Sequence, residues 1–189
     1  MKARIKEDDS SVPYLYNGYY YITRFETGKD YPIHSRKKGS LDAKEEIMFD
    51  CNEMAKGQSY FSLSGINISE DNKWAAFGLD LVSRRQYVIQ IKNLETGEIL
   101  PVKLENTTGG STWASDNKTL FYTRKDEKTL RSDKIYKHIL GTEASEDQMI
   151  FNEKDDTFNT FVYKEKSKKY LVIGSSSTLT SEYQILEAN

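Results

Sequence analysis

Two stretches of the sequence share a polar turn that is followed at once by a hydrophobic segment. The turns are Asp71-Asn72-Lys73 and Asp116-Asn117-Lys118, and their aspartates lie 45 residues apart. The segments after them read WAAFGL and TLFYTR. Asp and Asn side chains bond to nearby backbone amides and tolerate left-handed conformations, so both triplets are typical of turns. An interval of about 40–50 residues is typical of the four-stranded blades of a β-propeller.

The segments around these turns have the patterns of strands. In YVIQIKNL, Tyr87, Ile89 and Ile91 fall on one face of a strand, while Gln90 and Lys92 fall on the other. The segment DKIYKHIL alternates similarly, and EILPVKL and QMIFNE predict the outer strand of each repeat. CNEMAKG is the one place where a short helical turn is expected.

Strands of the same kind before and after this pair give about three and a half to four blades. We therefore predict an all-β fold: a partial β-propeller of antiparallel four-stranded blades over residues 12–189, preceded by a flexible segment, 1–11. The repeats are expected near 12–56, 57–105, 106–155 and 156–189.

A ring of blades closes only when every blade has two neighbours, and known rings begin at about four blades. An incomplete ring exposes an apolar sheet face and an unpaired strand edge, and both attract partners. We therefore expect the chain to be a piece of a longer protein. When it is alone, we expect it to self-associate.

Composition excludes several classes of protein. The net charge of −2 gives no sign of nucleic-acid binding. No apolar run approaches the roughly 20 residues that span a bilayer, and the start MKARIKEDDSS does not resemble a signal peptide. The single cysteine, Cys51, rules out an intramolecular disulfide and fits a reducing compartment. A cytoplasmic protein without nucleic-acid or membrane partners is expected.

Several long segments, taken together, resemble a known family. DLVSRRQYVIQIKNLETGE, ILGTEASEDQMIFNEKDDTF and SKKYLVIGSSSTLTSEYQIL, with SVPYLYNGYYY at the entry to the first blade, are similar to the oligopeptidase B (protease II) branch of the prolyl oligopeptidase family. The resemblance runs from about Ile5 to Glu187 and keeps the order of the segments.

The resemblance implies a seven-bladed propeller that caps a C-terminal α/β-hydrolase domain, and this second domain is absent from the sequence. In that family a Ser-Asp-His triad in the hydrolase domain cleaves short peptides, and members of this branch cleave after Arg or Lys. The propeller would then act as a gate and lid, inactive by itself. A stand-alone propeller module for protein interactions is the alternative.

The search for chemistry within the chain agrees with a non-catalytic part. GGSTW and GSSST lack the second glycine and the following helix of a G-x-S-x-G nucleophile elbow. His34 and His138 are expected to be partly exposed strand residues, and Cys51 a small packing residue, without the spacing of a zinc site. No catalytic residue, cofactor or metal is predicted.

Two charged stretches remain as candidate sites. The acidic run EKDDT, Glu153 to Thr157, could hold a cation or a basic substrate residue, but a solvated loop between blades is the favoured interpretation. Arg85, and second Arg84, lie in a predicted hairpin loop and suit an ion pair across a domain interface. Two solvated arginines are the alternative there.

Overall fold

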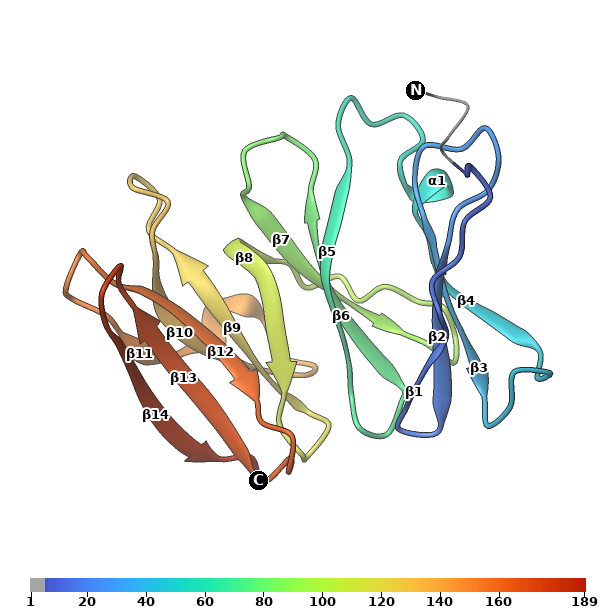
Figure 1. The fold of residues 1–189 in the computed structure, drawn as a ribbon. Helices are drawn as coiled ribbons and strands as arrows, with labels where there is room; N and C mark the ends of the chain where they lie inside the picture. Colours follow the sequence, from blue (N-terminus) through green and yellow to red (C-terminus); the bar gives the residue numbers. More distant parts are fainter. Residues whose placement is uncertain (1–5) are drawn as a thin grey trace. The chain divides into compact units, whose positions relative to one another are not determined.

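The computed structural model describes residues 6–189, in which fourteen β-strands and two short helical turns are found. The chain divides into two compact units, 1–58 and 59–189. Within the described residues no helix is long and apolar enough to span a membrane. The all-β prediction is confirmed (Figure 1).

Unit 1 holds one antiparallel sheet with the strands in chain order. Its elements are β1 (Tyr14–Tyr16), β2 (Tyr19–Arg24), β3 (Ile33–Lys38), β4 (Glu45–Asp50) and the helical turn α1 (Cys51–Met54). The β1–β2 connection is the two-residue turn Asn17-Gly18, with both φ angles positive, as such tight hairpins require. The side chain of Asp50 caps α1 by accepting from the amides of Asn52 and Glu53, which confirms the helical turn expected there.

The segment before β1 is bonded to the sheet. The amide of Ser11 donates to the carbonyl of Thr23 over 2.8 Å, and the amide of Phe25 donates to the carbonyl of Asp9 over 2.7 Å. Residues 1–5 of the segment expected to be flexible lie outside the described residues, whereas Asp9 and Ser11 extend the backbone pairing of β2.

Unit 2 holds ten antiparallel strands in two sheets (Figure 1). The first sheet has seven strands in chain order: β5 (Ser62–Ile68), β6 (Trp74–Asp80), β7 (Tyr87–Asn93), β8 (Leu104–Trp113), β9 (Thr119–Lys125), β10 (Ser132–Ile139) and β11 (Gln148–Asn152). A short 3-10 helix, η2 (Ala144–Glu146), precedes β11. The second sheet has three: β12 (Asn159–Lys164), β13 (Tyr170–Ser176) and β14 (Ser181–Glu187).

The seven-stranded sheet is two blades joined through β8. The first half of β8 pairs with β7, where Leu104 faces Ile89, and the second half pairs with β9, where Trp113 faces Leu120. We call β5–β7 with the first half of β8 the second blade, the rest of that sheet the third blade, and β12–β14 the fourth blade. The repeat boundary predicted between 105 and 106 falls inside β8.

Three glycines let β8 cross the strands of the second blade. A Cβ atom on Gly65 of β5 would lie 2.0 Å from the carbonyl oxygen of Gly109, and one on Gly78 of β6 would lie 2.5 Å from the Cα of Gly109. A Cβ on Gly109 would meet the ring of Tyr87. Side chains are excluded at Gly65 and Gly78 by the backbone of β8, and at Gly109 by the ring of Tyr87.

The outer strand predicted at EILPVKL is wrong for most of that segment. One isolated bridge, between Lys92 and Ile99, is the pairing found before β8 begins at Leu104. Pro101 has no amide hydrogen to donate to a ladder, and this explains the break. The outer strand predicted at QMIFNE is present as β11.

The two repeated turns occupy equivalent places and contact each other. Asn72 and Asn117 both have positive φ angles, 62° and 58°. The side-chain oxygen of Asn117 accepts a hydrogen bond from the amide of Asp71 over 2.9 Å. The predicted repeat is therefore also a packing contact between neighbouring blades.

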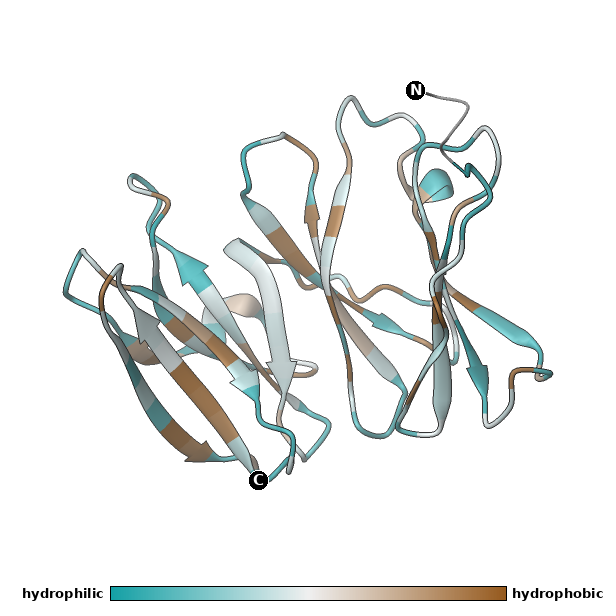
Figure 2. Cartoon of the chain, in the orientation of Figure 1, coloured by the Kyte–Doolittle hydropathy of each residue, from teal (hydrophilic) through white to brown (hydrophobic). Residues whose placement is uncertain are grey.

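Each face of β9 packs into a different hydrophobic core. Leu120 and Tyr122 belong to a core with the second blade that includes Ile89, Ile91 and Trp113. Phe121 belongs to a core with the fourth blade that includes Ala114, Ile135, Leu171 and Ile173. Figure 2 shows the hydrophobic residues gathered along the strands, whereas most turns are hydrophilic.

Candidate functional site

The two serine sequences that come nearest to a nucleophile elbow are strand segments. Ser111 of GGSTW lies within β8, and Ser175 of GSSST lies near the end of β13. The hydroxyls of both serines are buried. A nucleophile elbow places its serine on a sharp strand-to-helix turn, where the hydroxyl is accessible. Neither segment has this geometry.

The third blade contains a buried His–Asp–Tyr cluster. His138 Nδ1 lies 2.7 Å from Asp147 Oδ1, and the Tyr122 hydroxyl donates to Asp147 Oδ2 over 2.8 Å. The side chains of His138 and Asp147 are both fully buried. The expectation that His138 is partly exposed is wrong, because Asp147, which directly follows η2, supplies a polar partner inside the core.

This cluster is a structural element rather than a reaction centre. Its carboxylate contacts the imidazole of His138 and the hydroxyl of Tyr122, which sit on adjacent strands, and substrate has no surface from which to reach it. Burial, the hydrogen bond to Asp147 and the charge of Asp147 raise the pKa of Tyr122 far above its ordinary value. The phenol therefore stays protonated and keeps donating.

The other histidine and the cysteine are in unit 1. His34 is half-buried, with Nδ1 3.1 Å from the Thr23 hydroxyl, and burial lowers the pKa of its imidazole. Cys51 is buried, and burial first, then the charge of Asp50, raises the pKa of its thiol to about 11. A thiol of this kind is a packing residue. Among residues 6–189 no group of three or more His, Cys, Asp or Glu side chains could hold a metal ion.

The acidic run EKDDT is the connection between the third and fourth blades. Arg131 holds it through its guanidinium, which donates to the backbone carbonyls of Glu153, Asp155 and Phe158 over 2.8–3.1 Å. Asp155 caps its own turn, and hydrogen bonds from the amide and hydroxyl of Thr157 lower the pKa of its carboxyl. This geometry fits the favoured interpretation, a solvated loop between blades.

Arg84 and Arg85 lie in the loop between β6 and β7, and both are exposed. The backbone of this loop is held firmly. The buried carboxylate of Asp80 accepts from the amides of Val82 and Arg85 over 2.9 and 2.8 Å, and the ammonium of Lys125 donates to the carbonyl of Arg85 over 2.6 Å. Arg85 has a positive φ of 54°. The two guanidinium groups therefore project from a fixed backbone into solvent.

The same loop exposes hydrophobic side chains beside the arginines. Val82 is 60% exposed and Leu81 38%. Leu179 in the β13–β14 loop and Leu130 in the β9–β10 loop are also exposed, and these loops join the corresponding strands of the next two blades. A firmly held loop that carries two arginines and exposed apolar groups has the composition of a protein contact.

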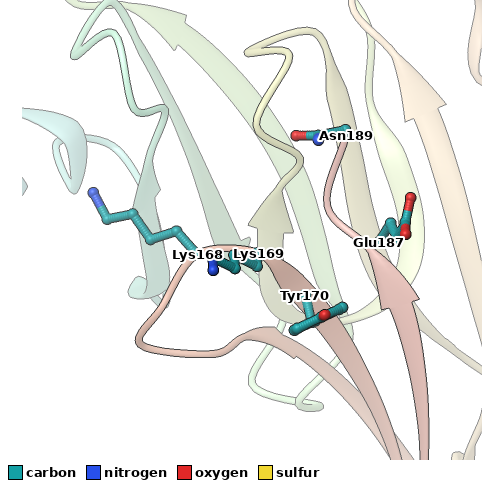
Figure 3. A pocket seen from close by; sticks show the side chains of 5 residues that line it. All are labelled: Lys168, Lys169, Tyr170, Glu187 and Asn189. Carbon is teal, nitrogen blue, oxygen red and sulfur yellow. The ribbon is translucent and has the colours of Figure 1, made fainter.

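A shallow pocket of about 360 Å³ lies at the end of the fourth blade, lined by Lys168, Lys169, Tyr170, Glu187 and Asn189 (Figure 3). In Figure 3 the side chain of Lys168 extends away from Tyr170 and Glu187. The lining has no pairing of nucleophile and base, so we assign it no chemistry.

Sequence reasoning missed the polar residues that tie strands and blades together. These residues are Arg131, Asp147 and Lys164. The partner of each lies far away in the sequence or at a separation that matches no known motif. The repeat gives a signal for Lys164 alone, because this residue ends β12 and directly precedes the turn at 165–169.

Comparison with known proteins places the chain in a family. The model of the prolyl oligopeptidase N-terminal β-propeller domain matches residues 1–189. Dipeptidyl aminopeptidase BI of Pseudoxanthomonas mexicana is 39% identical over 98% of the chain, and Protease 2 of Moraxella lacunata is 33% identical over all of it. The chain spans about 28% of the length of both relatives.

The fold has a close counterpart among solved structures. Oligopeptidase B from Leishmania major superposes with a TM-score of 0.91 at 33% identity, over 98% of this chain and 26% of that one. The match over the full chain and this superposition agree with the strand order and the repeated blades described above. The chain belongs to the family of prolyl oligopeptidase N-terminal β-propeller domains.

Proposed function

We propose that this chain forms part of the propeller lid of a serine-type peptidase, whose reaction takes place on an α/β-hydrolase domain of the same protein. The match of the family model over residues 1–189 carries the proposal. The relatives named as a dipeptidyl aminopeptidase and as a protease support a peptidase. A lid of this kind acts by exclusion: it limits which substrates reach the serine and keeps bulk water away.

The proposed substrates are short peptides, cleaved after Arg or Lys in the cytoplasm. The substrate class follows from the resemblance to the oligopeptidase B branch, and the 33% identity to the Leishmania major enzyme supports that branch. The single cysteine, free and buried, is consistent with a reducing compartment.

Hydrolysis of fluorogenic peptides tests the proposal. The intact protein is expected to release the fluorophore after Arg and Lys faster than after Ala or Glu, and a serine-directed inhibitor is expected to abolish the activity. Peptides with free and blocked amino termini separate dipeptide release from internal cleavage. Inhibitor-sensitive turnover by the 189-residue chain alone would overturn the assignment of the chemistry to another domain.

Arg85, with Arg84 second, is the proposed contact of this lid with the hydrolase domain. The support is the exposed guanidinium groups on a backbone fixed by Asp80 and Lys125, with Val82 exposed beside them. Arginine suits this role because its planar fork bonds a carboxylate bidentately.

Charge reversal in the intact protein tests this contact. Arg85→Glu is expected to change peptidase kinetics and to favour the open state, which small-angle scattering detects. Lys73→Glu is the matched control, because Lys73 is also exposed but precedes β6, whereas Arg85 follows it. Unchanged kinetics and unchanged opening in Arg85→Glu would remove the idea.

We also propose that the chain by itself associates through the face of the fourth blade that points away from the third. Phe161, Tyr163, Tyr183 and Ile185 lie on this face and are exposed. Phe161 stacks on Tyr163 and meets Tyr183 edge to face, with ring centres 6.2 and 6.5 Å apart. A contiguous aromatic surface of this kind attracts a partner.

A further inference from the structure

The turns that follow the first strands of the second, third and fourth blades converge at one end of unit 2. These first strands are β5, the second half of β8, and β12, and β8 contacts both of the others. Residues 69–73, 114–118 and 165–169 form the turns. The bond from the amide of Asp71 to Asn117 already joins the first two turns.

Lys164 connects all three blades at this end. It is the last residue of β12, in the fourth blade. Its ammonium donates to Glu70 Oε1 of the second blade over 2.6 Å and to the Ser115 hydroxyl of the third blade over 3.4 Å. Lys164 and Glu70 are 94 residues apart in the chain. A single side chain thereby reaches past one blade to bind the next.

The contact is sheltered from solvent. The side chain of Lys164 is 11% exposed and that of Glu70 is 28% exposed. Ion pairs on an open surface contribute little because water and salt screen them, whereas a charge-assisted hydrogen bond that is largely buried contributes more.

Ser115 of the third blade also bonds directly to the fourth blade. Its amide donates to the carbonyl of Ala188 over 2.6 Å, and its hydroxyl donates to the carbonyl of Lys168 over 3.3 Å while it accepts from Lys164. The contacts therefore form a closed circuit through the three turns. We call Glu70, Ser115 and Lys164 the inner-turn junction.

We propose that the inner-turn junction is a latch, in which Lys164 makes the three turns open together and keeps the ends of the three first strands from separating. Removal of the ammonium takes away the donor that Glu70 and Ser115 share, so the second and third blades lose a contact at once. At the opposite end of the blades Lys125 joins the second and third blades through the carbonyl of Arg85. That contact involves two blades rather than three.

Hydrogen exchange of the intact protein that carries this chain, followed by mass spectrometry, tests the latch. Lys164→Met keeps most of the unbranched side chain and removes its charge. Exchange in all three turns is expected to become about tenfold faster, because loss of a hydrogen bond to a charged group shifts local opening by about that factor. Lys166→Met, at an exposed lysine in the same region, is the control and should leave exchange unchanged. Acceleration confined to 165–169, or none, would overturn the proposal.

A double-variant cycle guards against a folding defect in Lys164→Met. Glu70→Gln is expected to accelerate exchange in the same three turns, and the double variant to go little beyond Lys164→Met. Lys164→Arg, which keeps the charge, should retain most of the protection. Additive effects, or loss of protection in Lys164→Arg equal to that in Lys164→Met, would contradict a shared latch. Because exchange needs no substrate, failure of the latch and failure of the peptidase assignment can be told apart.

Discussion

The third and fourth blades have the same pattern of strands, but in the described part of the chain neighbouring blades pack against both faces of the third and against only one face of the fourth. In β9 of the third blade, Leu120 and Tyr122 pack toward the second blade and Phe121 packs toward the fourth. In β13 of the fourth blade, Leu171 and Ile173 pack toward the third blade. On the other face of β13, Val172 and Gly174 are buried beside the aromatic side chains of β12 and β14, which are themselves exposed.

Gly174 lies on the face of the fourth blade that no other described blade covers. It is buried because the ring of Phe161, its cross-strand partner, lies over it. In the second blade, by contrast, Gly65 is covered by the backbone of a crossing strand. Position in the stack therefore decides whether the same kind of strand is buried by a neighbouring blade or by its own side chains.

Truncation of hydrophobic side chains should give the largest difference in stability between the two blades. Leu120→Ala, in the third blade, is expected to lower the free energy of unfolding by about 2–5 kcal/mol, because it leaves a cavity between blades. Ile185→Ala, at a residue that is 65% exposed on the fourth blade, should cost less than about 1 kcal/mol. Denaturant unfolding of the chain at low concentration measures both. Losses of similar size would show that the two faces are equally covered.

Glycine substitutions sharpen the comparison at a smaller scale. Gly65→Ala places a Cβ 2.0 Å from a backbone oxygen at a residue with φ of 64°, and we expect a loss on the order of 3 kcal/mol. Gly174→Ala meets the ring of Phe161, which is 37% exposed and can rotate outward, so roughly 1 kcal/mol is expected. Thermal unfolding ranks the two variants. A larger loss for Gly174→Ala would contradict an open fourth blade.

The buried cluster of the third blade should give a smaller effect than Leu120→Ala or Gly65→Ala, with a distinctive pH dependence. Tyr122→Phe is expected to cost about 1–2 kcal/mol at neutral pH through the lost bond to Asp147. Because the pKa of Tyr122 is raised in the folded state, its contribution is complete below pH 10.0, the ordinary value, and is lost as the pH rises above it.

Unfolding measured from pH 8 to pH 11 tests this sign. Stability of the Tyr122→Phe variant should fall less steeply above about pH 10 than that of the unchanged chain. Tyr183→Phe, on the exposed face of the fourth blade, is the matched control and should keep the steep fall. An equally steep fall in Tyr122→Phe would refute the role of the buried phenol.

The fold could be predicted as far as local chemistry determines it. The repeated turns required left-handed residues, and Asn72 and Asn117 adopt that conformation. The alternation of Ile89 and Ile91 placed both in the core. Pro101 indicated that its segment could not pair throughout. The hydrophobic residues around it favoured a strand, and that prediction was wrong.

The buried polar contacts could not be predicted, because the fold brings their partners together without any recognised spacing in the sequence. The burial of His138 depends on Asp147, which a turn and η2 bring back over β10. Lys164 looks in the sequence like any lysine at the end of a strand, yet it bonds to Glu70 two blades away. Arg85 could be placed in a loop from the sequence, and its role at a domain contact remains a proposal.

Light scattering of the 189-residue chain across a range of concentrations tests most directly whether its blades are built to rest on further sheets. The unchanged chain is expected to associate as its concentration rises, whereas a Tyr183→Lys, Ile185→Lys variant, charged on the open face of the fourth blade, should stay monomeric. A monomeric unchanged chain at high concentration, with the same mass as the variant, would contradict the account.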